Sequence, residues 1–170
     1  MAHNETLEIY LVGLRNAHAL EKEAVSIMSR QVERLESYPD ILKRLQEHIR
    51  ETETQQQRLK DILARFDEDT SSIKDLGGKL MGSLAALGHS VAGDEILKNT
   101  FANYAFENYE IASYKSLITL SDALGNTADT KLLEQTLGEE IAMASWIEDH
   151  VEATTLKFVK LRQAGEQAKV

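Results

Sequence analysis

The sequence predicts an all-α fold: an up-down bundle of four long helices, with a long crossover that carries a short fifth helix. Apolar residues recur at three- and four-residue steps through most of the chain, which is the spacing of an amphipathic helix. No segment shows the apolar–polar alternation of a β-strand. Only one proline, Pro39, interrupts the helical patterns, so the helices can be long.

We expect the first helix over residues 5–35 and the second from Pro39 to about Phe66. Pro39 fits the first turn of a helix, where its missing N–H leaves no hydrogen bond unmade. The polar run 67–72 ends the second helix. The first helix carries the apolar positions Tyr10, Leu14, Ala17, Ala24, Met28, Val32 and Leu35.

The second half of the chain predicts another pair of long helices. A short helix is expected over residues 73–87, ended by Gly88, and a long one over about 93–124. Gly125 and Asn126 break that helix before the last, over 129–160. Short turns make each pair an antiparallel hairpin. The crossover of about 27 residues can return along the bundle at about 1.5 Å per helical residue. We expect residues 1–170 to form a single domain.

The composition limits the classes of function. The chain has 170 residues, of which 28% are charged, and a net charge of -9. Because no basic patch is present to contact phosphates or anionic lipids, we expect neither nucleic-acid nor membrane binding. The absence of cysteine excludes disulfides, thiolate chemistry and cysteine-ligated metal clusters. The first residues lack the pattern of a signal peptide, and we therefore expect a cytoplasmic protein.

Acidic residues lie at matched heights in the two predicted hairpins. Glu21 lies 17 residues before the centre of the first turn, near residue 38, and Glu51 lies 13 after it. In an antiparallel pair, these side chains fall within about one helical turn of the same height. In the second hairpin, Glu110 lies 16 residues before the turn near residue 126, and Glu139 and Glu140 lie 13 and 14 after it.

Other residues of these helices belong to the same pattern. Glu107 stands three residues before Glu110 in FENYEIASYKSL (106–117), and a helix would place both carboxylates on one side, beside an apolar stripe. His48 and Glu51 share a side in the same way. We expect His48 to be a metal ligand or to orient one, and His18 to be an exposed neighbour of the cluster.

Several buried carboxylates cannot all stay anionic without a cation, so they would protonate, pair with bases or bind metal. Carboxylates together with a histidine suit iron or manganese, so a site for such a metal is one expectation. Glutamate is also among the best helix formers, so solvated acids on helix flanks are the alternative. The candidate metal ligands are Glu21, His48, Glu51, Glu107, Glu110, Glu139 and Glu140.

Four segments resemble the YciE/YciF-type ferritin-like proteins of bacteria: AHALEKEAV (17–25), HIRETETQQQRL (48–59), ENYEIASYKSL (107–117) and LLEQTLGEE (132–140). The resemblance spans most of the chain in order, and E-x-Y-E-I-A-S-Y is its most distinctive part. It implies a ferritin-like bundle, a homodimer, a role in bacterial stress responses and a dinuclear metal site. Residue by residue, it supports Glu21, Glu107, Glu110 and Glu139.

The chain departs from the family pattern at several positions. Arg50 stands where the second helix of the family usually has an acid, so either Glu51 takes that role or the site is incomplete. Leu-Ala-Ala at 84–86 replaces the paired acids of the crossover helix. The Glu-x-x-His pairs of ferritin-like bundles are also missing, since Met143 follows Glu140 by three.

Two functions fit this sequence. The first is a stress-protective metalloprotein whose two iron or manganese ions react with dioxygen or peroxide. The second is a non-catalytic, dimeric helical-bundle scaffold with a degenerate metal site, whose inner acids pair with Arg50, Lys22 or Lys115. The sequence leaves both open, and with them whether the protein is an enzyme.

Overall fold

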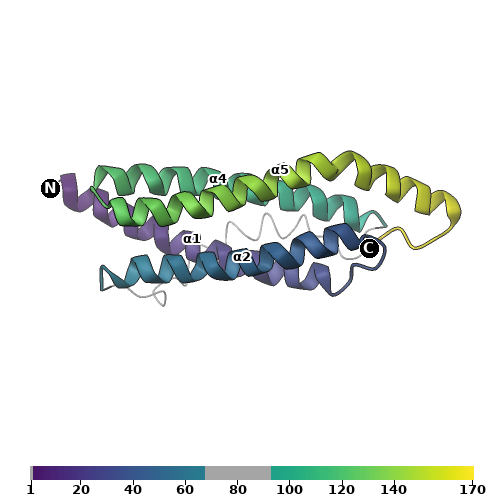
Figure 1. The fold of residues 1–170 in the computed structure, drawn as a ribbon, viewed down its shortest axis with the longest axis horizontal. Helices are drawn as coiled ribbons and strands as arrows, with labels where there is room; N and C mark the ends of the chain where they lie inside the picture. The colour runs from purple at the N-terminus through teal and green to yellow at the C-terminus, as the bar shows by residue number, and fades with distance from the viewer. Residues whose placement is uncertain (1, 68–92) are drawn as a thin grey trace.

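A computed structural model describes residues 2–67 and 93–170 of the chain. They form four helices, α1 (Ala2–Val32), α2 (Pro39–Ala64), α4 (Glu95–Ala123) and α5 (Thr127–Ala164), and no strand occurs within these two ranges (Figure 1). The predicted all-α bundle is confirmed. The short helix expected over 73–87 lies outside the described residues.

The helix ends follow from local sequence. Pro39 stands in the first turn of α2, as expected. Gly125 (φ 75°) and Gly165 (φ 72°) take the left-handed backbone conformation just after α4 and at the end of α5. Because Gly165 supplies this stop, α5 extends to Ala164, beyond the end expected near residue 160.

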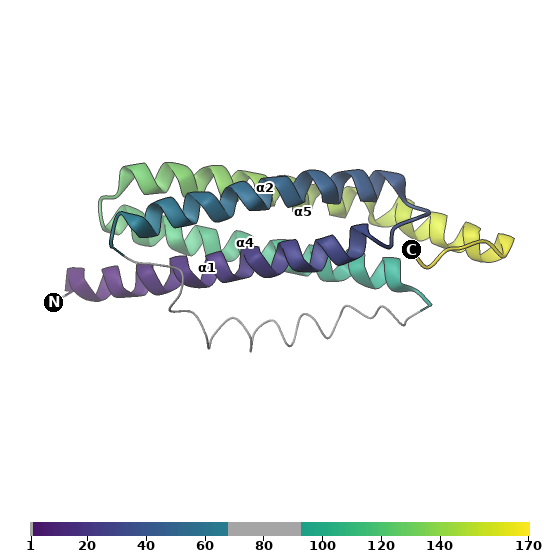
Figure 2. The same ribbon diagram turned by 90° about the horizontal axis from the view of Figure 1, so that it is seen from below.

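The four helices pack as two antiparallel hairpins that face each other. α1 contacts α2 and α4, and α5 contacts α4 and α2. Helices α2 and α4 run in the same direction, and α1 and α5 run in the opposite direction (Figure 2). This arrangement places one helix on each side of a common axis.

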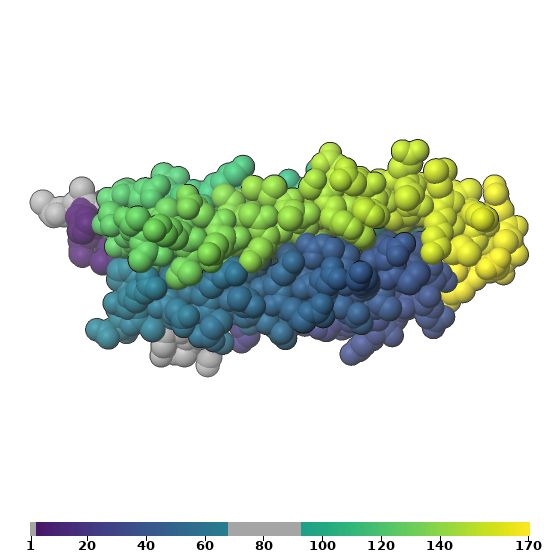
Figure 3. Space-filling model, in the orientation of Figure 1, coloured from purple at the N-terminus to yellow at the C-terminus, as the bar shows by residue number. Residues whose placement is uncertain are grey.

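Contacts at one end of the bundle help to fix this arrangement. There, Arg34 after α1 pairs with Glu95 of α4 at 2.8 Å. The C-terminal segment returns to the same end, where the Tyr38 hydroxyl donates to the carbonyl of Ala168 at 2.7 Å. The last turns of α5 extend past the other helices, as the space-filling view shows (Figure 3). None of the described helices has a stretch long and apolar enough to span a lipid bilayer.

The apolar core consists of two clusters with a polar layer between them. On every helix, the sequence passes from one cluster through the polar layer to the other. The first cluster is Tyr10, Leu14, Ala17, Leu59, Ile62, Leu63, Tyr114, Leu117 and Leu133. The second is Leu20, Ala24, Met28, Leu45, Phe106, Met143 and Ile147. The buried polar residues between them are Glu21, His48, Thr52, Gln55, Glu107, Glu110, Thr136 and Glu140.

Candidate metal centre

Five potential metal ligands meet in the polar layer, and every helix of the bundle contributes at least one. Each of these five residues is 3% exposed or less. Such burial is unusual for acids and requires partners that replace water. The five are Glu21 from α1, His48 from α2, Glu107 and Glu110 from α4, and Glu140 from α5.

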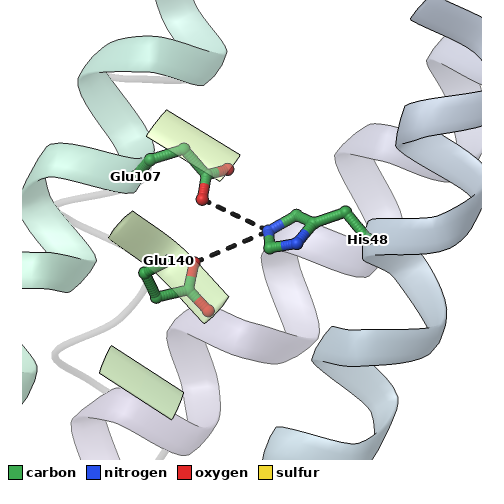
Figure 4. Close-up of side chains that lie close together, drawn as sticks. All are labelled: His48, Glu107 and Glu140. Atoms are coloured by element: carbon green, nitrogen blue, oxygen red, sulfur yellow. Dashed lines mark ion pairs between the residues drawn. The ribbon is translucent and has the colours of Figure 1, made fainter. Parts of the chain in front are cut away.

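The five residues form two groups that share Glu140. In the first, His48 Nε2 lies 3.2 Å from Glu107 Oε2 and 3.5 Å from Glu140 Oε2, as ion-pair contacts rather than directed hydrogen bonds (Figure 4). In the second, Glu21 and Glu110 face Glu140. Within each group the potential ligand atoms lie within 4.8 Å of one another. Two adjacent three-ligand groups with a common carboxylate are the arrangement of a dinuclear centre.

The spacing of the two α4 acids explains why each joins a different group. Glu107 and Glu110 are three residues apart, so they lie on one side of α4 but about 4.5 Å apart along its axis. Glu107 therefore reaches the level of His48, and Glu110 reaches that of Glu21. Glu140 on α5 lies between these levels and faces both.

His48 is oriented by a partner behind it. Its Nδ1 lies 2.8 Å from Glu51 Oε2, and Arg44 contacts the same oxygen at 3.1 Å. The contact with His48, with the charge of Arg44, lowers the pKa of Glu51 to about 2. Glu51 thus lies outside both groups and accepts the Nδ1 proton of His48, which leaves Nε2 directed at the centre.

Glu139 also lies outside the two groups. Arg58 binds Glu139 through both terminal nitrogens of its guanidinium group, at 2.6 and 2.8 Å. The amide of Gln55 donates to Glu139 Oε2 at 2.9 Å and, by a very short contact, to Glu140 Oε1. Gln55 therefore connects the outer acid to the inner one and fixes the orientation of Glu140.

Tyr114 holds Glu21, the potential ligand that α1 contributes. Its hydroxyl donates to Glu21 Oε1, which leaves Glu21 Oε2 without a hydrogen-bond partner among the described residues. Tyr114 is 1% exposed, and burial together with the charge of Glu21 raises its pKa well above the ordinary value. The hydroxyl therefore stays protonated and acts as a donor.

Burial and mutual repulsion set the charges of the metal-free centre. Burial raises the pKa of Glu107 to about 8, although His48 opposes the rise. Burial, then the neighbouring acids, raise the pKa values of Glu21 and Glu110 well above the ordinary value. Burial alone would lower the pKa of His48 and raise that of Glu140. The facing partners reverse both shifts, so His48 holds a proton and Glu140 is anionic. In the metal-free protein, protons occupy this centre.

The chain can now be compared with known proteins. Residues 5–160 match the family model described as "Domain of unknown function (DUF892)". The chain belongs to this family.

Relatives of this DUF892 chain include Protein YciF of Escherichia coli (strain K12), which is 27% identical over 146 residues, 79% of this chain and 83% of that protein. A crystal structure of a protein from Xanthomonas campestris pv. campestris is 29% identical, with a TM-score of 0.79 over 94% of this chain and 99% of that one. The crystal structure of the E. coli stress protein YciF has a TM-score of 0.73 at 24% identity, over 86% and 94% of the two chains. The expected YciF-type relationship is confirmed.

The donor set of this DUF892 chain fits two metal ions. Five carboxylate oxygens have no hydrogen-bond partner in the described part of the chain: Glu21 Oε2, Glu107 Oε2, Glu140 Oε2 and both oxygens of Glu110. Across residues 2–67 and 93–170, no lysine or arginine nitrogen forms an ion pair with the inner carboxylates. The pairing with Arg50, Lys22 or Lys115 that a degenerate site would show is thus not seen there. Carboxylate oxygens and one imidazole are donors for iron or manganese.

The structure thus separates the seven sequence candidates into three roles. Glu21, His48, Glu107, Glu110 and Glu140 come together, Glu51 orients a ligand, and Glu139 pairs with an arginine. Gln55 lies four residues after Glu51 and three before Arg58, so the sequence indicated that these residues share a side of α2. It gave no sign of their partners on α5, Glu139 and Glu140.

The expectation that His18 is exposed is wrong. His18 is 3% exposed and its Nε2 has no hydrogen-bond partner in the described ranges. Because α1 packs against both α2 and α4, its buried face is wider than a single stripe. Burial, with the charges of Lys60 and Lys22, lowers the pKa of His18 to about 4, so its ring is neutral. His18 belongs to neither metal-ligand group.

Proposed function

We propose that this protein is a dinuclear metalloprotein in which five residues hold two iron or manganese ions. The observation that carries the proposal is the pair of buried three-residue groups with Glu140 in common. One group offers an imidazole and two carboxylates, and the other offers three carboxylates. The proposed ligands are Glu21, His48, Glu107, Glu110 and Glu140.

Charge balance favours two divalent ions over one. The five ligands contain four carboxylates, whose total charge is -4 when all are ionised. Two divalent cations bring +4, so the filled centre carries no net charge from ions and ligands. A single cation would leave two uncompensated buried anions, each of which would cost several kcal/mol or remain protonated.

The residues around the ligands prepare the centre. Glu51 keeps His48 Nε2 directed inwards, Gln55 holds one oxygen of Glu140, and Tyr114 holds one oxygen of Glu21. Each of these contacts holds a proposed ligand by one atom, and in the two carboxylates the other oxygen, Glu21 Oε2 or Glu140 Oε2, has no hydrogen-bond partner among the described residues. As ions enter, the protons on Glu21, Glu107 and Glu110 and the Nε2 proton of His48 have to leave, so uptake releases protons.

Two bound ions of iron or manganese would supply the one-electron steps needed to reduce dioxygen or peroxide. The chain's own residues keep bulk water from the centre, because every proposed ligand is 3% exposed or less. A relative described as a stress protein has the same fold. We therefore propose that removal of an oxidant is the cellular role, as part of a stress response.

Metal content per chain tests the proposal. The protein is loaded anaerobically with ferrous iron and desalted, and the iron is then counted against protein. We expect about two irons in the natural protein and a loss of most of this iron in Glu140→Gln, because Glu140 serves both groups. Glu139→Gln is the matched control, since the adjacent acid pairs with Arg58, and it should retain the natural content.

A folded natural protein that retains no iron or manganese overturns the proposal and favours the scaffold alternative. Retention of the natural content by Glu140→Gln would also overturn it, because the metal would then lie elsewhere. Circular dichroism of each variant establishes that the bundle has folded. The expected homodimer stays a prediction, which light scattering on the eluted protein tests.

A further inference from the structure

A small cavity lies between α2, α4 and α5, next to the His48 half of the centre. Its volume is about 20 Å³. Three of its lining residues, Leu45, Asn103 and Met143, lie three or four positions from His48, Glu107 and Glu140, respectively. One helical turn is about 5 Å, so the inner wall of the cavity adjoins the first ligand group on all three helices.

All three residues lie on the same side of the ligands. Leu45 precedes His48 on α2, Asn103 precedes Glu107 on α4, and Met143 follows Glu140 on α5. Helices α2 and α4 start, and α5 ends, at the end of the bundle where the α1–α2 turn lies. The cavity therefore continues from the centre towards that end, within the second apolar cluster.

The outer wall of the cavity is less buried than the inner one. Trp146 and His150 line it, and both are only half-buried, whereas Met143 and Ile147 are 1% and 3% exposed. The two rings are stacked with centroids 3.8 Å apart, and His150 Nδ1 lies 2.7 Å from the carbonyl of Trp146. The cavity thus lies between a stacked pair of rings near the surface and the buried centre.

Most of the lining is apolar, although it includes some polar residues. Asn103 exchanges two hydrogen bonds with Gln31, at 2.9 and 3.1 Å. Thr100 donates to the carbonyl of Ile96 at 2.8 Å. The rest of the lining consists of the side chains of Ile41, Leu45, Met143, Trp146 and Ile147, together with His150 and Thr154. Cavities with mostly apolar walls accept apolar gases.

We propose that this cavity binds dioxygen and passes it to the His48 half of the centre. A cavity that holds one water needs about 10–15 Å³, so 20 Å³ admits one two-atom molecule and excludes larger substrates. The use of the bound gas rests on the proposed function, but the binding itself does not, since the cavity exists in the metal-free protein.

Binding is tested first without metal. Methyl NMR of the natural, metal-free protein is recorded under several bar of oxygen and again under nitrogen. Paramagnetic relaxation from oxygen should be at least about twofold stronger at the methyls of Leu45, Met143 and Ile147 than at those of Leu59 and Leu133, which are similarly buried in the other cluster and do not line this cavity. Equal relaxation in the two clusters overturns the inference, whatever the metal content.

Passage to the centre is tested with a variant that fills the cavity. Thr154→Leu adds side-chain volume at a lining position, and Thr155→Leu is the matched control one residue further, outside the lining. In iron-loaded protein, Thr154→Leu should slow oxidation by dioxygen at least about tenfold and leave the iron content unchanged, since no ligand is altered. Natural rates in Thr154→Leu overturn the route. Absence of iron from all three proteins would instead remove the proposed function, while the NMR result stands on its own.

Discussion

Replacing Glu110 by methionine should stabilise the metal-free protein and abolish full metal loading. Glu110 is 1% exposed, and neither of its carboxylate oxygens has a hydrogen-bond partner among the described residues. Methionine has similar length and volume but no polar group to leave unsatisfied, so the core can keep its packing. Residues that make a fold less stable are expected at positions where function requires them, and Glu110 would be such a residue.

The magnitude follows from the burial of the carboxyl group. A buried polar group without partners costs about 1–3 kcal/mol, so the variant should gain about 2 kcal/mol in its free energy of unfolding. For a chain of this size, 1 kcal/mol shifts the midpoint of thermal unfolding by about 2–4 °C. We expect the metal-free Glu110→Met protein to unfold about 4–8 °C above the natural one.

The assay is thermal unfolding followed by circular dichroism, first with chelator and then with manganese. The natural protein should gain about 2.7 kcal/mol for each ion that it binds, at a manganese concentration one hundred times the dissociation constant. Glu110→Met should gain clearly less at that concentration, because one of the two ligand groups is incomplete. Glu139→Met is the control: it loses a partly exposed ion pair with Arg58, so its metal-free form should be destabilised by about 1 kcal/mol or less.

One result would refute this reasoning. If metal-free Glu110→Met is less stable than the natural protein by more than about 1 kcal/mol, the carboxyl group makes structural interactions that its unpartnered oxygens do not indicate. The centre would then be part of the scaffold of the bundle rather than a prepared site.

Three further predictions concern the residues around Glu110. Between pH 4.5 and about 8, Glu107 in the folded protein keeps a proton that the unfolded chain has lost, so the stability of the metal-free protein should fall as the pH rises through this window. The affinity for manganese should rise over the same range, because fewer protons have to be displaced. Constant affinity in titrations at pH 6, 7 and 8 would contradict this. Tyr114→Phe removes the donor to Glu21 and should cost about 1–2 kcal/mol in urea unfolding, whereas an unchanged midpoint would show that the hydroxyl is not needed. Glu51→Gln should weaken metal affinity about 10- to 100-fold by releasing His48, as calorimetry can measure, and unaltered affinity would remove its orienting role.

Much of the fold could be predicted from the sequence, because the signals for it are local. Three- and four-residue apolar spacing, Pro39 and Gly125 set the main helices and their limits. The matched heights of Glu21 and Glu110 about their turns also follow from a fixed rise per residue. These signals depend only on neighbours along the chain, so one sequence contains them.

The roles of paired acids could not be predicted in the same way. Glu139 and Glu140 are adjacent in sequence, and each fits a helix at the right height. The rotation of α5 against α2 decides that Glu140 faces inwards and that Glu139 meets Arg58, 81 positions earlier in the chain. A rotation of one residue, about 100°, would exchange these roles, and the balance of apolar contacts over the whole helix sets it.

The sequence by itself determined a bundle of four helices with acids at one level of its interior. Only the tertiary structure decided which atoms meet there. Tyr114 and Glu21 lie 93 positions apart, and no local pattern records that the hydroxyl of one holds the carboxylate of the other. Periodicity fixes the level of a side chain along its own helix, whereas its partner depends on how four separate helices rotate and close on one another.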